Sequence, residues 1–313
     1  MSQAASGDRD VRVAVIGGTG CGGAAVVRSL AEAGARVLVI SRGVSACPPP
    51  GIEWAPLDRH DTEALRCALG AFEPETLVDQ IVYTAAESEA LGQALPQSVR
   101  RVIVASSAIV YGADRRGLPY DEDAPLTPDD PFAQTKAAAD VAARTLPSAT
   151  VLRLGMLYGP GQAPLTPLGR EPRLRERLLA GEPLPVPADD PPRLQPLFAP
   201  DYGELIRRLL ETETSPPALN VTGDETLSWG ALLSAWATAW GTPSPRLEPL
   251  GHEALAARAP PYLRRFLPSL LAPTRVSTAR LRACVPEWRP HSLGAGLQEL
   301  LTGSTEQGPA RSG

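Results

Sequence analysis

The feature that most constrains the fold is a regular alternation of short apolar runs and helical patterns in the first half of the chain. Apolar runs rich in β-branched residues occupy positions 11–16, 35–40, 52–57, 76–84, 100–107 and 150–155. Segments with helical periodicity lie between most of them, at 24–34, 61–72, 88–95 and 131–146. Short apolar runs of this kind are typical of strands that are buried on both faces. Their alternation with helices predicts right-handed βαβ crossovers and a doubly wound, parallel α/β sheet.

The second half of the chain is less regular, because proline-rich stretches at 160–167 and 183–196 interrupt it. Helical patterns recur near 173–180, 201–211, 228–240 and 292–300, and the run 218–223 predicts one more strand that returns to the sheet. We therefore expect a nucleotide-binding domain over residues 1–160, and we expect the segment 197–225 to return to this domain. Segments 161–196 and 226–302 are expected to form a smaller substrate-binding lobe over the carboxyl ends of the strands, and the polar segment 303–313 a disordered tail.

Composition narrows the class of protein. The 313-residue chain has a formal net charge of −5, which makes nucleic acid an unfavourable partner. It has no run of eighteen apolar residues and no apolar leader, so we expect neither a membrane span nor a signal peptide. The three histidines are scattered and the four cysteines form no CxxC pair, which predicts reduced thiols and no metal site. These features favour a cytoplasmic monomer or homodimer that acts on a small molecule.

A glycine-rich loop directly follows the first predicted strand. Gly17, Gly20 and Gly23 have the spacing GxxGxxG, with Thr19 and Cys21 between them. Such a turn lets the backbone approach a pyrophosphate closely, and the following helix offers unpaired N–H groups and a positive dipole. A glycine turn without function is the alternative, but its place within βα repeats favours a dinucleotide-binding Rossmann unit. No Gly-Lys-Ser/Thr follows, which excludes a nucleoside triphosphatase loop.

The end of the second predicted strand indicates which dinucleotide is bound. An NAD site usually has a carboxylate there, which accepts hydrogen bonds from the adenosine ribose. This chain has Ser41 and Arg42 instead, and a guanidinium pairs well with a 2′-phosphate. We therefore predict NADP(H), with NAD(H) as the alternative cofactor and a solvated arginine as the alternative reading of Arg42. Asp58, after the third strand, is a candidate for contact with the adenine.

Four later segments carry a family resemblance. They are SSAIVYG at 106–112, PFAQTK at 131–136, LRLGMLYGPG at 152–161 and NVTG at 220–223. Over residues 11–302 the chain resembles the extended and atypical short-chain dehydrogenases/reductases of the NAD-dependent epimerase/dehydratase family. Segments WAPLDRHD and VDQIVYTAAE are similar to the branch with the chloroplast stem-loop-binding-like proteins. The resemblance implies a Rossmann domain, a smaller substrate lobe and a nicotinamide cofactor.

The same resemblance implies a set of site residues. The family uses a Ser/Thr, a Tyr and a Lys, and Ser107 and Lys136 match the first and the last. Phe132 stands four residues before Lys136, at the tyrosine position, and a phenyl ring cannot transfer a proton. Tyr111 is a further catalytic candidate. The resemblance also implies further contacts to the cofactor, from Val82, Tyr83, Lys136, Gly155, Met156 and Leu157. The substrate pocket it implies is formed by Tyr83, Ser107, Phe132 and Tyr158.

Three interpretations of the function remain open at this point. The first, which we favour, is a reductase or isomerase whose proton comes from Tyr83, Tyr111, Tyr120, a bound water or the substrate. The second is a protein that binds NADP without turnover, and the third is an RNA-binding protein. Both site residues also have a purely structural interpretation, in which Ser107 caps a turn and Lys136 is solvated on the surface. With Phe132 in place, we expect reduction of a conjugated, iminium-like or otherwise activated small molecule, of secondary metabolism, rather than epimerisation of a sugar nucleotide.

Overall fold

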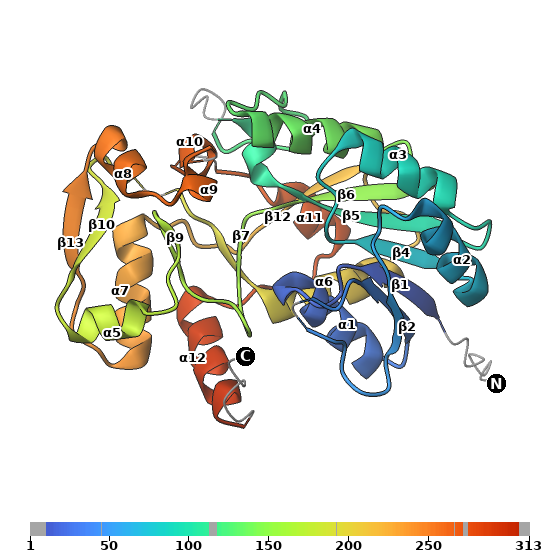
Figure 1. Cartoon of the computed structure of the whole chain (residues 1–313), viewed down its shortest axis with the longest axis horizontal. Coiled ribbons are helices and arrows are strands. Elements are labelled where there is room, and N and C mark those ends of the chain that lie inside the picture. Colours follow the sequence, from blue (N-terminus) through green and yellow to red (C-terminus); the bar gives the residue numbers. More distant parts are fainter. Residues whose placement is uncertain are drawn as a thin grey trace.

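The computed structural model describes residues 11–44, 46–112, 118–191, 193–265, 267–271 and 275–306. A larger α/β body lies beside a smaller lobe (Figure 1). The body is built on a seven-stranded parallel sheet of order β12-β6-β5-β4-β1-β2-β3, which confirms the predicted doubly wound fold. Its strands are β1 (Arg12–Ile16), β2 (Arg36–Ser41), β3 (Glu53–Pro56), β4 (Thr76–Asp79), β5 (Arg101–Ser107), β6 (Ala149–Leu154) and β12 (Ala218–Val221). The strand order reverses between β1 and β4, and the carboxyl ends there form the crevice in which such sheets bind ligands.

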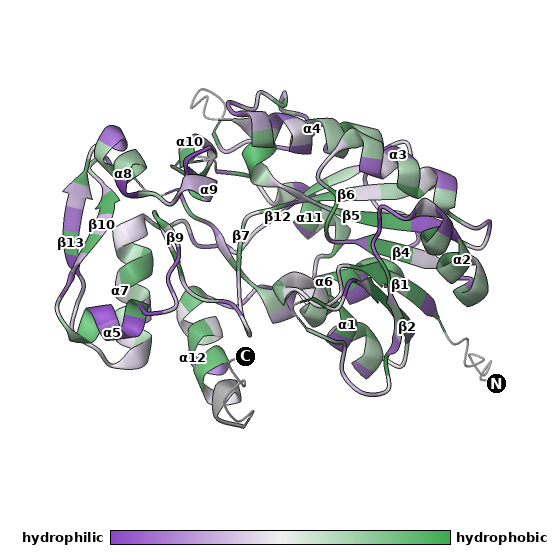
Figure 2. Ribbon diagram, in the orientation of Figure 1, coloured by the Kyte–Doolittle hydropathy of each residue, from purple (hydrophilic) through white to green (hydrophobic). Residues whose placement is uncertain are grey.

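Helices cover both faces of the sheet (Figure 1). One face carries α1 (Cys21–Glu32), α6 (Ala199–Glu211) and α11 (Ala279–Cys284), and the other α2 (Thr62–Phe72), α3 (Ala85–Ala94) and α4 (Pro131–Ala143). Alternate residues of a strand therefore enter different cores: Val13 and Val15 pack under α1 and α6, whereas Ala14 and Ile16 pack under α2 and α3. The hydrophobic central strands in Figure 2 agree with burial on both faces.

The smaller lobe has its own core. Its elements are α5 (Leu174–Leu179), β10 (Pro183–Pro187), α7 (Trp229–Trp240), β13 (Arg246–Leu250), α8 (His252–Arg258), α9 (Pro261–Arg264), α10 (Leu267–Leu271) and α12 (Leu293–Glu306). Trp229 and Trp236 of α7 are buried among leucines of these helices. Between body and lobe, β7 (Met156–Tyr158) pairs with β11 (Pro196–Phe198), and β8 (Leu165–Thr166) with β9 (Gly169–Arg170). A 3₁₀ turn, η1 (Ala108–Tyr111), follows β5.

The predicted fourth strand is too long. β4 ends at Asp79, whose carboxylate accepts a hydrogen bond from the N–H of Ile81 and turns the chain. Helix α3 then begins at Ala85, three residues earlier than expected. Thr84 caps it, since its hydroxyl accepts from the N–H of Glu87 while the Glu87 carboxylate accepts from the N–H of Thr84. Residues 80–84 therefore form a loop above the sheet.

Three further differences lie in the second half. The proline-rich stretch 183–196 contains β10 and the start of β11, because proline is tolerated in the short edge strands of two-stranded sheets. The segment around Leu281 and Trp288 packs in the core of the larger body instead of the smaller lobe. Helix α12 continues through Gly303 to Glu306, so the first part of the predicted tail is helical, and residues 307–313 lie outside the described part of the chain.

Candidate active site

The glycine loop between β1 and α1 has the geometry of an anion-binding turn. Gly17 has a φ of +80°, which favours glycine. A Cβ at Gly23 would lie 2.1 Å from the carbonyl oxygen of Gly17, so only glycine lets the helix pack on the turn. Gly20 is the N-cap of α1, with no side-chain cap and no acidic residue in the first turn. A Cβ there would meet nothing within 4 Å beyond the neighbouring backbone, so the start of α1 borders open space, and the unpaired N–H groups of a helix N-terminus suit a pyrophosphate.

A cavity of about 320 Å³ opens beside this loop. It brings together seven predicted cofactor residues, Gly17, Thr19, Gly20, Ser41, Arg42, Asp58 and Tyr83. The Ser41 hydroxyl accepts a hydrogen bond from Nε1 of Trp54 at 3.2 Å and keeps its own hydrogen to donate. Arg42 is exposed at the rim. The elongated set of contacts, from the loop to the ends of β2 and β3, fits a dinucleotide.

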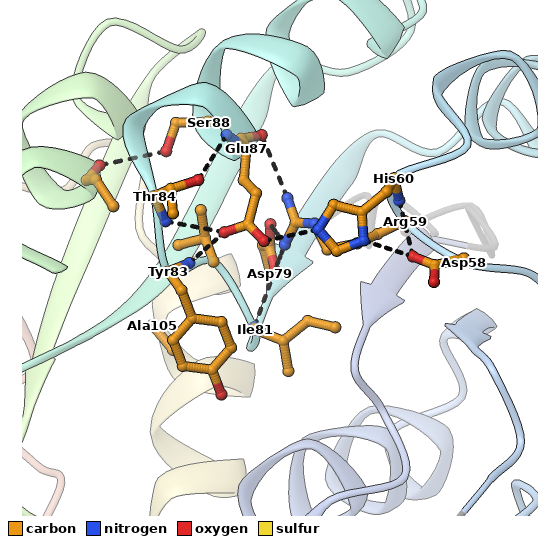
Figure 3. A network of polar contacts seen from close by, with 12 residues as sticks. Asp58, Arg59, His60, Asp79, Ile81, Tyr83, Thr84, Glu87, Ser88 and Ala105 are labelled. Atoms are coloured by element: carbon orange, nitrogen blue, oxygen red, sulfur yellow. Dashed lines mark hydrogen bonds and ion pairs between the residues drawn. The ribbon is translucent and has the colours of Figure 1, made fainter. Parts of the chain in front are cut away.

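Sequence reasoning missed a polar network beside this cavity, which Figure 3 shows and from which Arg59, His60 and Glu87 line the cavity. Arg59, next to Asp58, donates from Nη1 to both carboxylate oxygens of Asp79 at 2.8 and 2.7 Å, and both side chains are buried. His60 bridges Asp58 at 2.7 Å and Glu87 at 3.0 Å. These two hydrogen bonds to carboxylates raise the pKa of His60. The sequence held one signal for this network: Asp58, Arg59 and His60 directly follow the third predicted strand, at the carboxyl edge of the sheet.

A second cavity, of about 280 Å³, contains four more predicted residues: Ser107, Gly155, Met156 and Leu157. It extends under the smaller lobe to residues that sequence reasoning did not select, which are Arg170, Arg193, Gln195, Thr222 and Leu270. The Ser107 hydroxyl accepts a weak hydrogen bond of 3.4 Å from the N–H of Ile109, so Ser107 both caps η1 and faces the cavity.

The lining of the second cavity combines apolar walls with a few polar groups. Arg170 donates to the carbonyl oxygens of Ala163 at 2.9 Å and Leu157 at 3.2 Å, and burial lowers the pKa of its guanidinium. Thr222 is 1% exposed, and its hydroxyl has no hydrogen-bond partner within the described residues. A buried hydroxyl at a cavity wall is suited to bind a polar group of a ligand.

Lys136 is buried rather than solvated, and it lies behind the first cavity. Its Nζ donates to the carbonyl oxygens of Val82 and, at 3.0 Å, of Ala105. The Tyr83 ring covers it, with 4.8 Å between Nζ and the ring centroid. Burial lowers the pKa of Lys136 to about 8. Neither Lys136 nor Val82 lines either cavity; together they join the loop after β4 to the end of β5.

Phe132 lies at the start of α4, one turn before Lys136. The Asp130 carboxylate accepts from the N–H of Ala133 at 2.9 Å and caps this helix, whose first residue is a proline. The ring of Phe132 packs against Tyr83, with 6.4 Å between the centroids. The helical spacing of Phe132 and Lys136 is thus confirmed, and Tyr83 contacts both side chains.

The structure places three other candidates away from both cavities. The Tyr111 hydroxyl is fully buried, donates to Asn220 at 2.7 Å and accepts from Arg153 at 2.6 Å, so it holds β5, β6 and β12 together. Tyr158 packs against Phe198 in the core of the smaller lobe. Cys21 faces a shallow groove between α1 and α6, and burial raises the pKa of its thiol, which fits a small packing residue.

Two classes of site are absent from the described residues. No group of three or more His, Cys, Asp or Glu side chains there is arranged to hold a metal ion. No helix in the same ranges combines the length and hydropathy that crossing a membrane requires.

Comparison with known proteins agrees with this geometry. The model of the NAD dependent epimerase/dehydratase family matches residues 13–222. The chain belongs to this family. A nucleotide cofactor, NAD(P), is typical of this family, and the glycine loop and first cavity fit that group.

Individual relatives of this epimerase/dehydratase-family protein differ in reaction. A 2'-dehydrokanamycin reductase of Streptomyces kanamyceticus is 28% identical over 240 residues, which cover 74% of this chain and 68% of the relative. A UDP-glucose 4-epimerase of Azospirillum brasilense is 30% identical over 179 residues, about half of each chain (51% and 51%). The chain is therefore similar both to a reductase and to a sugar-nucleotide epimerase.

Solved structures of the family show the same fold. The UDP-glucose 4-epimerase of Thermotoga maritima superposes with a TM-score of 0.75 at 19% identity, over 95% of this chain and 99% of that chain. The UDP-glucose 4-epimerase of Thermus thermophilus in complex with NAD gives a TM-score of 0.73 at 24% identity, over 96% of this chain and all of that one (100%).

Proposed function

We propose that this protein is an NADPH-dependent reductase of an activated carbonyl or imine group in a small, uncharged or anionic molecule. The observation that carries the proposal is the proximity of the start of α1 to the second cavity. A Cβ at Gly22, in the first turn of α1, would lie 3.1 Å from Cδ1 of Leu157, which lines the second cavity. A dinucleotide that begins at Ser41 and Arg42 and crosses the N-terminus of α1 would therefore extend toward the cavity that contains Ser107.

The preference for NADPH rests on the groups at the end of β2. Arg42 supplies a fork of N–H donors and a positive charge, and Ser41 retains a hydroxyl hydrogen, at the place where a carboxylate would select NAD. A 2′-phosphate placed there gains both contacts. The ribose hydroxyl of NADH gains no charge pairing from them.

The residues of the chain have separate tasks in this proposal. When bound, the dihydronicotinamide supplies a hydride. Ser107 donates a hydrogen bond to the reacting oxygen or nitrogen of the substrate. The apolar side chains of Met156, Leu157 and Leu270 exclude water from the second cavity. Phe132, in place of the tyrosine, leaves the substrate without the usual phenol, which favours groups that already accept a hydride readily.

The lining of the second cavity restricts the substrate. Arg170 and Arg193 are the ionisable groups among its described lining residues, and no carboxylate occurs among them. Burying a cation beside two guanidinium groups would cost free energy, so cationic substrates are disfavoured. A volume of about 280 Å³ is at the small end of ligand pockets and suits a compact molecule. The similarity to a reductase supports the reaction class.

Epimerisation of a sugar nucleotide is the second candidate, and the similarity to a UDP-glucose 4-epimerase favours it. The two reactions differ in their net use of cofactor. A reductase consumes one NADPH for each product formed, whereas an epimerase ends each cycle with its cofactor unchanged. NADP binding without turnover and RNA binding are the remaining alternatives.

The test combines calorimetric titration with NADPH and NADH and a record of NADPH absorbance. The carbonyl panel contains matched neutral, carboxylate-bearing and amine-bearing α-diketones. UDP-glucose is incubated separately with NAD⁺ or with NADP⁺, because epimerisation begins with oxidation of the sugar. We expect tighter binding of NADPH than NADH, and NADPH consumption with neutral or anionic diketones but not with cationic ones. Conversion of UDP-glucose with no net reduction of NAD⁺ or NADP⁺ would establish the epimerase instead. Binding of a dinucleotide with no conversion of any compound would support the alternative of a protein that binds NADP without turnover.

A further inference from the structure

We propose that Tyr83 is the catalytic residue that donates the proton during reduction, in place of the tyrosine that Phe132 replaces. The inference rests on the proposed reductase function and adds a residue from a different element. Tyr83 lies in the loop between β4 and α3, whereas Phe132 lies on α4. Their rings are in contact. The phenol is therefore on Tyr83, next to the position on α4 where the family has its tyrosine and this chain has Phe132.

The positions of the other tyrosines support this choice. All six tyrosines of the chain are in the described ranges. Tyr111 and Tyr202 are fully buried, and their hydroxyls bond to Asn220 and Gln80. Tyr120 stacks on Tyr111 and Tyr158 lies in the core of the smaller lobe, while Tyr262 is exposed on α9. Tyr83 alone among the six lines one of the two cavities described above, and that cavity is the first, beside Gly17 and Gly20 of the glycine loop.

Lys136 links Tyr83 to the end of the strand that carries Ser107. Its ammonium group binds the carbonyl of Val82, the residue before Tyr83, and that of Ala105, two residues before Ser107. The loop after β4 and the end of β5 are therefore held together by one side chain. The Tyr83 ring covers the ammonium group and separates it from the first cavity. The cation remains close enough to stabilise negative charge on the ring.

The Tyr83 backbone is fixed while its hydroxyl stays available. The N–H of Tyr83 donates to the Glu87 carboxylate at 2.6 Å, and His60 holds that carboxylate from its other side. In Figure 3 the Tyr83 ring extends away from Glu87, with the hydroxyl at its far end. Tyr83 is 46% exposed, and its hydroxyl has no hydrogen-bond partner within the described residues. A substrate oxygen or a water can therefore reach it.

The reaction balances with groups that the proposal names. NADPH, when bound, would supply the hydride that the carbonyl carbon accepts, and the C=O π electrons would then move to oxygen. The O–H bond of Tyr83 breaks and its proton joins that oxygen, so that the products are an alcohol, NADP⁺ and a Tyr83 phenolate. Solvent reprotonates the phenolate at the open cavity. Burial, together with the Glu87 and Asp79 carboxylates, raises the pKa of Tyr83, so the phenol begins each cycle protonated.

One test of the position of Tyr83 needs no turnover. The phenolate absorbance near 295 nm is titrated with pH in the wild-type protein and in Tyr83→Phe, each with and without NADP⁺. The difference between the two proteins isolates Tyr83. We expect NADP⁺ to lower the Tyr83 pKa by about one pH unit, because its nicotinamide ring carries a positive charge. An unchanged Tyr83 titration with NADP⁺ bound would overturn the placement.

The second test measures turnover of the best carbonyl of the panel with NADPH. Tyr83→Phe should lower kcat by about 10²–10⁴-fold, the usual contribution of a general acid, with the Kd for NADPH unchanged. Adding Phe132→Tyr to Tyr83→Phe should restore at least part of the loss, because it returns a phenol to the other side of the contact. Tyr262→Phe, on the exposed surface, is the matched control and should keep the wild-type rate.

The outcomes separate the two proposals. A wild-type rate in Tyr83→Phe would contradict the role of Tyr83 and leave the reductase function intact. A wild-type protein that consumes no NADPH would contradict the reductase function. In that case the titration with NADP⁺ still decides whether the Tyr83 hydroxyl faces the nicotinamide.

Discussion

Arg59 and Asp79 form a buried ion pair at the carboxyl edge of the sheet, with Nη1 of Arg59 2.7 Å from Oδ2 of Asp79. The side chains are 5% and 0% exposed. The pair joins the end of β3 to the end of β4, and Arg59 also donates to the carbonyl of Glu87 at the start of α3. It therefore fixes the wall of the cofactor cavity from which Tyr83 and the His60–Glu87 contact extend.

Arg59→Met should lower the free energy of unfolding by about 3–5 kcal/mol, because it leaves the buried Asp79 carboxylate without its ion-pair partner. Arg258→Met is the control, since Arg258 pairs with Glu248 on the exposed surface and its loss should cost at most about 1 kcal/mol. Urea unfolding of both variants measures the difference. Equal, small effects would mean that the Arg59–Asp79 pair does not stabilise the wall.

The sequence predicted the parts of the fold that depend on local pattern. The strands around the glycine loop, the helical spacing of Phe132 and Lys136, and the return of 218–223 to the sheet all follow from periodicity and chain order. The loop at residues 80–84 did not, because its apolar residues continue the strand pattern while the Asp79 turn and the Thr84 cap end it. Short apolar runs do not by themselves show where hydrogen-bonded pairing stops.

The residues of the site were likewise predictable where chain order alone fixes their position, and not where long-range contacts do. Residues beside the loop and at strand ends, such as Gly20, Ser41 and Ser107, could be placed from order alone. Tyr111 lies outside both cavities because its hydroxyl is hydrogen-bonded to Arg153 and Asn220, which are distant in the sequence. Nothing local to Tyr111 reveals those bonds, because Asn220 is more than a hundred residues away in the chain.

Two glycines of the loop should respond differently to substitution. Gly20→Val should abolish dinucleotide binding and leave the fold unchanged, since its side chain points into open space that the pyrophosphate occupies. Gly23→Ala should destabilise the protein itself, because its Cβ would meet the Gly17 carbonyl at 2.1 Å. Calorimetry and thermal unfolding distinguish the two effects. Unchanged NADPH affinity in Gly20→Val would contradict the assignment of the loop.

Arg42→Ala should narrow the preference for NADPH over NADH by about 1–3 kcal/mol, the usual loss for a hydrogen bond to a charged group. Its affinity for NADH should remain near that of the wild type. Arg66→Ala, an exposed arginine on the outer part of α2, serves as the control. Equal affinity of the wild-type protein for both cofactors would show that Ser41 and Arg42 do not select the 2′-phosphate.

Lys136 should make stability depend on alkaline pH. Its pKa is about 8 in the native protein and 10.5 when solvated, so the unfolded chain binds more protons between these values. The free energy of unfolding should therefore rise from pH 8 to 10.5 through this group, by up to about 3 kcal/mol. Lys136→Met should lack that rise. Parallel stability curves for wild type and variant across this range would contradict the burial of a charged Lys136.

The most direct measurement of the proposed reaction follows a deuterium label from NADPH. The protein is incubated with NADPH deuterated at C4, on one face or the other, and with the carbonyl compound of the panel that it converts fastest. The account predicts that one deuterium, from one face only, appears on the former carbonyl carbon of an alcohol product, with one NADPH consumed for each alcohol. An alcohol product without deuterium from either labelled NADPH, or a label that stays in the cofactor whichever face carries it, would contradict the proposed reaction.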